Sequence, residues 1–328
     1  MRRRFGLALL CAVVALIVGA CGDSDDSSSG DESKGEQATT TLKVSYVPYV
    51  GAAPFELGIK KGFFKKRGLE IDASQGPAPA PIMAQVVSGQ LDIGFTTIPA
   101  LIAAVSGGAP LQAISAFDGV IDPDNPQGAI LVKEGSGISS PKDLEGKKVG
   151  VVALQSELDV LLHEVVRRDG GDEKQVKSVQ VPFPEMLAAL KADRVDAVVD
   201  VEPFLTLAKK EGGYESISFP EVEVVPNRAV TAFVASKDYI ADNPETIEKF
   251  RAAMKESLEY ADSHPDEAQQ TMVAVADMEP ELLKEINLGV IFDPNLDVES
   301  IEQFRSLMED FGYVKDPPPA EDLLAQGG

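Results

Sequence analysis

Two stretches of this chain repeat one pattern, and that repeat constrains the fold more than any other feature. Residues 91–101 read LDIGFTTIPAL, and residues 195–205 read VDAVVDVEPFL. In both stretches an aspartate, Asp92 or Asp196, precedes an apolar run, and a proline follows a few residues later. A short apolar run that ends in polar residues is typical of a buried strand, and proline is tolerated in the first turn of a helix. The repeat therefore predicts two similar strand–helix units.

The similarity extends beyond these stretches, because Lys43-Val44 corresponds to Lys148-Val149 and Pro99 corresponds to Pro203. Strand-like and helix-like segments alternate in both halves, which is typical of βαβ units and mostly parallel sheets. The sequence predicts strands over 42–47, 68–72, 91–95, 111–116, 148–152, 176–181 and 195–199. It predicts helices from residue 55 and over 82–88, 97–106, 156–168, 184–191 and 203–210. We therefore expect an α/β protein with two lobes, each a mostly parallel sheet flanked by helices.

The N-terminus, MRRRFGLALLCAVVALIVGAC, has a basic start, a short apolar run and small residues before Cys21. The run from Phe5 to Val18 is shorter than the roughly 20 apolar residues that span a bilayer, and its flanks are typical of a cleaved signal. Small residues followed by cysteine resemble a bacterial lipobox. Residues 1–20 are therefore predicted to be a lipoprotein signal peptide. Cys21 would then carry a lipid that anchors the chain to the extracytoplasmic face of the membrane. An ordinary signal peptide that contains a cysteine is the alternative.

The remaining chain divides by composition and pattern. Residues 21–40 are rich in serine, glycine and acids, and we expect a flexible tether there. Residues 41–127 are predicted to form the first part of lobe 1, and 128–226 a crossover strand and lobe 2. Residues 227–328 are predicted to return to lobe 1 through a second crossover strand and to end in helices. The tail from Pro317 is expected to fray.

Composition excludes several function classes. The chain has two cysteines, Cys11 and Cys21, and both fall in the N-terminal segment, so the folded body is expected to hold no disulfide and no cysteine-ligated metal. A net charge of −23 disfavours nucleic acid as a partner. Neither a phosphate-binding loop motif nor a zinc-protease motif occurs, and His163 and His264 lie in polar settings. We therefore expect a monomeric protein with no enzyme activity, no cofactor and no metal.

A candidate anion site follows from the strand ends, because ligands of α/β sheets bind beyond the carboxyl ends of strands. Thr96 and Thr97 stand where a strand turns into a helix, and Gln155 and Ser156 open a helix in the second half in the same way. Free N–H groups and hydroxyls at a helix N-terminus bind oxyanions. Ordinary helix capping is the alternative at each position.

Acidic residues occupy the matching turn of the second half. Asp200 and Glu202 follow the predicted strand 195–199, and buried carboxylates need a cationic or N–H partner. Either Arg228, near the second crossing, pairs with them, or they bind an amino group of a ligand; the alternative is that both acids are solvated. Threonines on one wall and acids on the other would suit a zwitterion or an amino-heterocycle.

Longer segments resemble a known family. The stretches VSYVPYVGAAPFELGIKKGFFKKRGLEID, SGQLDIGF and AAVSGGAPLQAISAF are similar to the sulfonate/nitrate/taurine-type solute-binding proteins of ABC transporters. This SsuA/THI5-like and NMT1-like group includes proteins that bind thiamine-pyrimidine precursors. ILVKEGSGISSPKDLEGKKVGV and DAVVDVEPFL resemble its second lobe, so the resemblance covers residues 41–265.

The resemblance implies a two-lobed type II periplasmic-binding-protein fold that captures a small molecule between its lobes. It also implies delivery of that solute to a permease driven by an ATPase. Carried over by position, the cleft would contain aromatic and polar side chains of both lobes, namely Tyr46 or Tyr49, Thr96, Thr97, Gln155, Ser156 and Glu202.

Two other functions stay open. Some relatives resemble pyrimidine synthases that use pyridoxal phosphate and a sacrificial histidine, and a sensory binding protein without a transport role would have the same fold. A cysteine-free body and a lipid anchor favour the binding protein. We therefore expect an extracytoplasmic solute-binding lipoprotein for a small polar solute, either a sulfonate, taurine or nitrate or an amino-heterocycle such as a thiamine-pyrimidine precursor.

Overall fold

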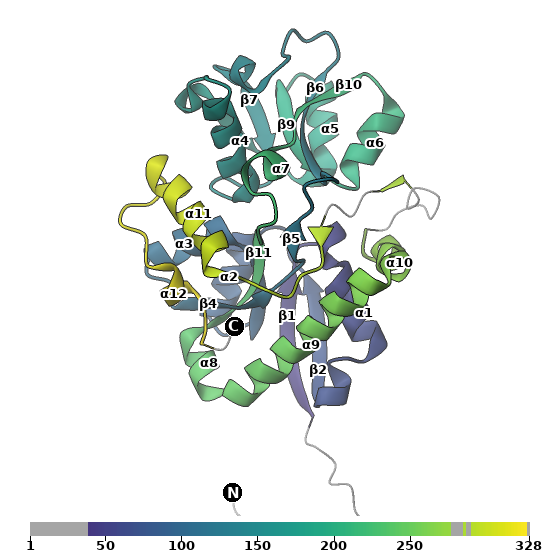
Figure 1. Cartoon of the computed structure of the whole chain (residues 1–328), viewed down its shortest axis with the longest axis vertical. Coiled ribbons are helices and arrows are strands. Elements are labelled where there is room, and N and C mark those ends of the chain that lie inside the picture. Colours follow the sequence, from purple (N-terminus) through teal and green to yellow (C-terminus); the bar gives the residue numbers. More distant parts are fainter. Residues whose placement is uncertain (1–38, 277–284, 287–289, 327–328) are drawn as a thin grey trace, which may run out of the picture. The chain divides into compact units, whose positions relative to one another are not determined.

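Two five-stranded sheets and the helices that cover them make up the computed structural model, which describes residues 39–276, 285–286 and 290–326 (Figure 1). The strands are β1 (Thr40–Tyr46), β2 (Leu69–Gln75), β3 (Ile93–Thr97), β4 (Leu111–Ala116), β5 (Val120–Ile121), β6 (Gly128–Lys133), β7 (Lys148–Val151), β8 (Lys177–Gln180), β9 (Ala197–Val201), β10 (Tyr214–Ser218), β11 (Thr231–Ser236) and β12 (Val290–Ile291). The helices are α1 (Ala53–Lys61), α2 (Pro79–Val87), α3 (Ile98–Ser106), α4 (Glu157–Arg168), α5 (Phe183–Lys191), α6 (Phe204–Glu211), α7 (Pro220–Val224), α8 (Lys237–Asp242), α9 (Pro244–Ser263), α10 (Pro265–Ala276), α11 (Val298–Asp310) and α12 (Ala320–Leu323). The predicted signal peptide and Cys21 lie outside the described residues.

The two sheets have the same plan. The first has the strand order β2-β1-β3-β11-β4, and the second has the order β8-β7-β9-β6-β10. In each sheet the strands run parallel except one, β11 in the first and β6 in the second, which is antiparallel to both of its neighbours. Helices α4 to α7 accompany the second sheet, and most other helices accompany the first (Figure 1). The predicted α/β fold with two mostly parallel sheets is confirmed.

The sequence repeat is present as a repeated contact. The backbone N–H of Lys43 donates to Asp92 Oδ2 at 2.8 Å, and the backbone N–H of Lys148 donates to Asp196 Oδ2 at the same distance. In return, each aspartate N–H donates to the carbonyl of its lysine. Lys43 lies within β1 and Lys148 begins β7, and each aspartate directly precedes the neighbouring strand, β3 or β9, so the aspartate in each half fixes the start of that strand.

The chain crosses between the sheets twice, and the two crossings are hydrogen-bonded to each other. The N–H of Ile121, in β5, donates to the carbonyl of Arg228 at 3.1 Å, and the N–H of Asn227 donates to the carbonyl of Ile121 at 3.0 Å. On its other side β5 pairs with β12. The predicted crossover strands correspond largely to β6 and β11, which lie within the sheets. The lobe boundaries predicted at residues 127 and 226 stay a prediction.

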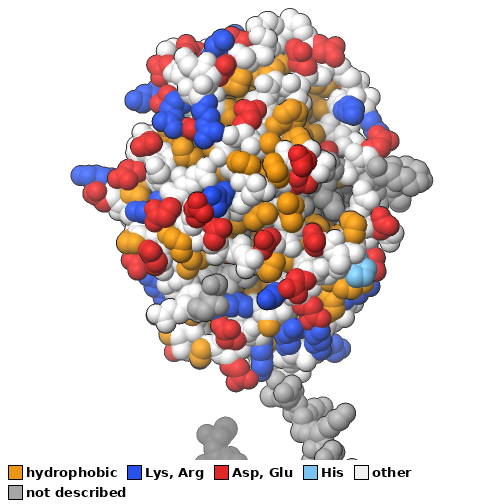
Figure 2. Space-filling model, in the orientation of Figure 1, with side chains coloured by type: hydrophobic (Ala, Val, Ile, Leu, Met, Phe, Trp, Pro, Cys, Tyr) orange, Lys and Arg blue, Asp and Glu red, His pale blue; other side chains and the backbone are white. Residues whose placement is uncertain are grey.

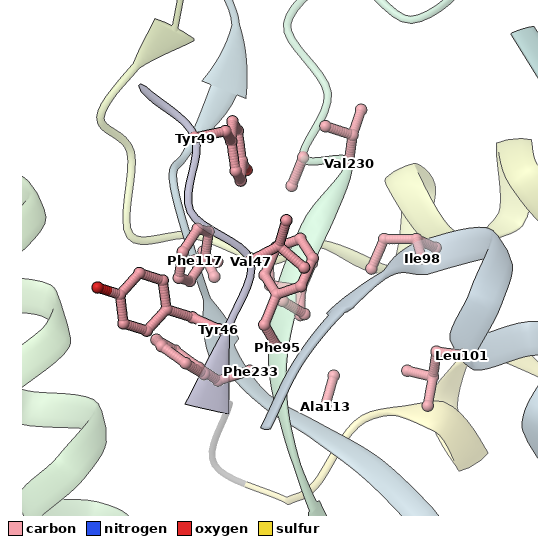
Figure 3. Packing of buried hydrophobic residues seen from close by; sticks show 14 of the residues in the cluster. Tyr46, Val47, Tyr49, Phe95, Ile98, Leu101, Ala113, Phe117, Val230 and Phe233 are labelled. Carbon is pink, nitrogen blue, oxygen red and sulfur yellow. The ribbon is translucent and has the colours of Figure 1, made fainter. Parts of the chain in front are cut away.

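Aromatic packing organises the core of the first sheet. The rings of Phe55, Phe117, Phe233 and Phe250 are fully buried, and Phe233 contacts each of the other three at centroid distances of 5.0–5.2 Å. Burying one such side chain stabilises a fold by about 1.5–3 kcal/mol. Figure 3 shows Phe117 and Phe233 below Tyr49 and Val230, which lie at the end of this cluster where the functional site begins.

Three sequence predictions about elements are wrong or incomplete. Helix α2 begins at Pro79, three residues before the predicted start at residue 82, because proline is favoured in the first turn of a helix. The tail does not fray: the N–H of Ala325 donates to the carbonyl of Ala113 at 2.9 Å, and Leu323 is fully buried. Strand β10 and helix α7 were not predicted. In the described part of the chain, no helix has both the length and the apolar character needed to cross a membrane.

Candidate functional site

A small cavity of about 50 Å³ lies where strand ends of the two sheets face each other. The first sheet and its loops contribute Val47, Tyr49, Pro79, Phe95, Thr97 and Asp118. The second sheet and its helices contribute Gln127, Val152, Ser156, Glu157, Leu158, Phe183, Val201 and Glu221, and the second crossing adds Val230 and Thr231. Thr97 is the last residue of β3, and Val201 is the last residue of β9, the strand that corresponds to β3 in the sequence repeat. The cavity therefore lies at corresponding strand ends of the two sheets.

Asp118 is a buried carboxyl group at one wall of the cavity. It follows β4, and its two oxygens accept hydrogen bonds from the hydroxyls of Tyr49 and Thr231. Burial raises the pKa of Asp118 to about 6, although these two hydrogen bonds act to lower it. The pKa of Tyr49 is raised by burial and by the nearby Asp118, so its hydroxyl stays protonated as a donor.

Glu157 and Glu221 form a pair of buried carboxyl groups on the second wall. Glu157 is the first residue of α4, Glu221 lies in α7, and Gln127 Nε2 donates to Glu221 Oε1 at 3.2 Å. Burial, together with the neighbouring carboxyl, raises the pKa of Glu157 well above its ordinary value. Burial also raises the pKa of Glu221, to about 7. Two carboxyl groups in contact cannot both ionise readily, so the pair holds a proton near neutral pH.

The cavity contains more hydrogen-bond acceptors than donors. Apart from the proton that the two glutamates share, no N–H or O–H group in the described part of the chain donates to Glu157 Oε1, Glu221 Oε2 or Gln127 Oε1, all of which are buried. Buried acceptors without donors are unfavourable by about 1–3 kcal/mol each. The lining residues named above include no lysine, arginine or histidine. These oxygens are free to accept hydrogen bonds from a ligand that carries N–H or O–H groups.

Aromatic rings and apolar side chains form the other walls. Tyr49 and Phe95 meet edge to face at 6.0 Å between ring centroids, and Figure 3 shows both near Val47 and Val230 at the end of the aromatic core. Phe183 lines the cavity from the second sheet. Apolar walls with a few convergent polar groups are typical of sites for small organic molecules, and aromatic faces suit flat rings. Among the described residues, no group of three or more potential ligands suits a metal ion.

Three of the residues predicted from the sequence line this cavity, namely Tyr49, Thr97 and Ser156. Thr97 Oγ1 accepts a hydrogen bond from the N–H of Ala100 at 3.4 Å and thereby caps α3. The Ser156 hydroxyl donates to the carbonyl of Ala153 at 2.7 Å. The first turn of α4 already carries the buried carboxyl group of Glu157 where a bound oxyanion was expected.

Tyr46, Thr96 and Gln155 are not among the residues that line the cavity. The Tyr46 hydroxyl donates to Glu56, and the Thr96 hydroxyl donates to the carbonyl of Thr97 at 3.1 Å. Gln155 has a left-handed backbone (φ 58°), and its N–H donates to an acid in the first turn of α4. Their roles in ligand binding stay predictions.

Asp200, Glu202 and Arg228 also lie outside the cavity lining. Asp200 is fully buried, and burial raises its pKa. The carboxylate of Glu202 accepts hydrogen bonds from the backbone N–H and the hydroxyl of Thr206, at 3.2 and 2.9 Å, near the start of α6. Arg228 forms an ion pair with Glu299 at 2.7 Å. Direct contact of these three residues with a ligand stays a prediction.

Sequence reasoning missed all three acids of the cavity. Asp118 lies two residues after the predicted strand 111–116, and Glu157 directly follows Ser156, so the strand-end rule applied to these positions could have found both. Glu221 gave no such signal, because β10 and α7, which place it, were not predicted.

Two sheets of this topology with a cavity between them have the fold of periplasmic binding proteins. The alkanesulfonate-binding protein SsuA from Xanthomonas axonopodis, solved with bound MOPS, superposes with a TM-score of 0.74 at 16% identity. That superposition covers 88% of this chain and 99% of the other. At that identity the superposition shows the fold alone.

Residues 51–268 match the family model described as NMT1/THI5 like, and the chain belongs to that family. A Haemophilus influenzae protein named for thiamine biosynthesis is 30% identical over 66% of this chain and 66% of its own length. A formylaminopyrimidine-binding protein from Halalkalibacterium halodurans is 24% identical over 97% of both chains. A 4-amino-5-hydroxymethyl-2-methylpyrimidine phosphate synthase from Candida albicans is 26% identical over 70% of both.

Proposed function

We propose that this chain is the solute-binding component of an ABC import system and that its solute is an amino-heterocycle of the aminopyrimidine class. The protein would be held at the extracytoplasmic face of the membrane by a lipid on Cys21, as a monomer, and would deliver the solute to a permease driven by an ATPase. The single observation that supports this ligand class is the excess of buried acceptors, Glu157 Oε1, Glu221 Oε2 and Gln127 Oε1, in a cavity walled by aromatic rings.

Different residues of the cavity would contact different parts of the ligand. An exocyclic amino group of the ligand would donate to the carboxyl oxygens of Glu157 and Glu221, and hydrogen bonds to charged groups contribute about 1.5–3 kcal/mol each. Phe95 and Phe183 line the cavity from opposite sheets and would contact the ring. The ligand would thereby supply the donors that these buried oxygens lack.

Sulfonates and nitrate fit this cavity poorly. An anion would lie beside Asp118, Glu157 and Glu221, with no basic side chain among the described lining residues to offset the repulsion. Charges buried without a partner are costly. The relative that is named for formylaminopyrimidine and aligns over 97% of this chain supports the same choice.

Calorimetric titration tests the proposal. We expect 4-amino-5-hydroxymethyl-2-methylpyrimidine or formylaminopyrimidine to bind and to raise the unfolding free energy by about 2.7 kcal/mol at a hundredfold excess over Kd. Taurine and nitrate serve as matched anionic probes. Binding of either anion without binding of any aminopyrimidine would overturn the proposal.

A pyrimidine synthase, the activity named for the Candida relative, receives no support from this cavity. Pyridoxal phosphate needs a lysine for its aldehyde and a cationic or N–H-rich cradle for its phosphate, whereas the described lining has no lysine and is acidic, so the residues do not fit the cofactor. Neither histidine lines the cavity: His163 contacts the carbonyl of Glu173 at 2.9 Å, and His264 stacks on Tyr260. Absorbance of pyridoxal phosphate bound to the purified protein would reopen this function.

A purely sensory role would be favoured if no permease gene accompanied this one.

A further inference from the structure

A second, larger cavity of about 490 Å³ adjoins the small one, and we call it the vestibule. Val47, Val152 and Phe183 line both cavities, so the two are neighbours. Five prolines contribute to the vestibule wall, namely Pro48, Pro77, Pro81, Pro182 and Pro184. Gln180 carries the only polar side chain among its described lining residues.

The two cavities differ in size. The inner cavity, at about 50 Å³, exceeds the roughly 10–15 Å³ that one water molecule needs and has room for the polar end of a small ligand. The vestibule is roughly ten times larger, and all but one of its described lining side chains are apolar. We therefore expect a ligand whose amino head fills the inner cavity to place the rest of its atoms in the vestibule.

We propose that the solute carries an uncharged, apolar substituent on its amino-heterocyclic head, and that this substituent binds in the vestibule. The inference rests on the proposed function and refines it, because it distinguishes the solute from compact hydroxymethyl- or phosphate-bearing pyrimidines. Phosphate finds no basic side chain among the described lining residues of either cavity.

Aromatic and aliphatic side chains give the vestibule an apolar surface that such a group would contact. Phe183, shared by both cavities, stacks on Phe204 with ring planes 18° apart and centroids 6.2 Å apart. The side chain of Leu154 is 54% exposed at the vestibule, the largest exposed fraction among the large hydrophobic residues described. An apolar substituent would bury this surface, and the proline rings add little conformational freedom to lose.

A homologous series of ligands tests the inference. The probes are 4-aminopyrimidines with hydrogen, methyl, propyl or benzyl at carbon 5, titrated by calorimetry against the mature protein. We expect the affinity to rise about fourfold for each methylene group added. Replacing the methyl group by a carboxylate is expected to weaken binding.

Two variants test whether the gain in affinity per methylene group arises in the vestibule. Leu154→Ser and Phe204→Ala are expected to reduce the gain per methylene to less than twofold while leaving the affinity for unsubstituted 4-aminopyrimidine within twofold. Leu207→Ser, at an exposed leucine on α6 outside the vestibule lining, is the matched control and should keep the full gain. If the unsubstituted head binds and the series is flat, or if both variants keep the gain, the inference is wrong and the proposed function stands. If no member of the series binds, the proposed function fails together with the inference.

Discussion

At the scale of single residues, the acids of the inner cavity have opposite effects on two properties. They lower the stability of the ligand-free protein, and they would raise its affinity for a ligand. Asp118, Glu157 and Glu221 are buried without a cation among the described lining residues, so the folded chain without ligand is less stable when they ionise. The same oxygens are the acceptors that a ligand with N–H groups would use. Binding sites commonly reduce stability in this way.

The variant Glu221→Gln tests the contribution of one acid to ligand affinity and to stability in the same protein. The amide has one acceptor oxygen in place of two, and Gln127 Nε2 already donates to that position. We therefore expect aminopyrimidine affinity to fall at least fivefold, which corresponds to about 1 kcal/mol, and the ligand-free protein to unfold at a higher temperature at pH 8. Glu215→Gln, at an exposed position on β10, is the control and should change neither property. Unchanged affinity in Glu221→Gln would show that Glu221 does not contact the ligand.

The pH dependence of stability follows from the raised pKa of Glu221. The folded chain holds this proton up to about pH 7, whereas the unfolded chain releases it near pH 4.5. Between these values the folded state binds more protons, so the contribution is fully present below pH 4.5 and is lost as the pH rises through 7. Its size is on the order of 3 kcal/mol. Urea unfolding at pH 5 and pH 8 should show a loss of stability that is smaller in Glu221→Gln; an equal loss in both proteins would contradict this assignment.

Which site residues could be found from the sequence depended on their local pattern. Thr97 and Ser156 stand at strand-to-helix turns, and Tyr49 lies in a loop carried over by resemblance, so all three were found. Asp200 and Glu202 occupy an equivalent turn, but their side chains lie outside the cavity lining, and local pattern does not determine that direction. Glu221 could not be found, because its place depends on long-range packing of α7 against α4.

At the scale of secondary structure elements, the sequence predicted most of the strands that build the sheets. Buried strands such as β3 and β9 are short apolar runs between turn residues, a pattern that is visible without tertiary information. Strand β10, with the sequence YESIS, lacks a strict alternation of polar and apolar residues, lies at a sheet edge and pairs with β6 through an irregular register. Its structure depends on that partner more than on its own sequence.

Gly58 offers a test of how closely two helices pack. It lies within α1, where glycine is less favourable than alanine by about 0.5–1 kcal/mol, but a Cβ atom there would lie 1.9 Å from Ser257 Oγ on α9. We expect Gly58→Ala to destabilise the protein by about 1–3 kcal/mol in chemical denaturation, because the collision outweighs the gain in helix propensity. Adding Ser257→Gly removes the obstructing atoms and should recover part of the loss. A more stable Gly58→Ala protein would show that the helices lie further apart.

At the scale of the whole molecule, charge is spread rather than concentrated. Despite the net charge of −23, Figure 2 shows acidic and basic side chains interspersed over the face it displays. Several of these charges form ion pairs at the surface, such as Lys66 and Arg67 with Glu256. The buried acids of the inner cavity, which have no basic side chain among the described lining residues, therefore contrast with the mixed surface, and this contrast would favour hydrogen-bond donors at the cavity.

The hydrogen bonds between the two crossings restrict how the sheets can part. Since Ile121 bonds both to Arg228 and to Asn227, the two connecting segments behave as one strip of paired backbone. Sliding one segment along the other would break these hydrogen bonds. We therefore expect the sheets to part by rotation about the paired segments and not by sliding, and a solute would then enter and leave through the vestibule.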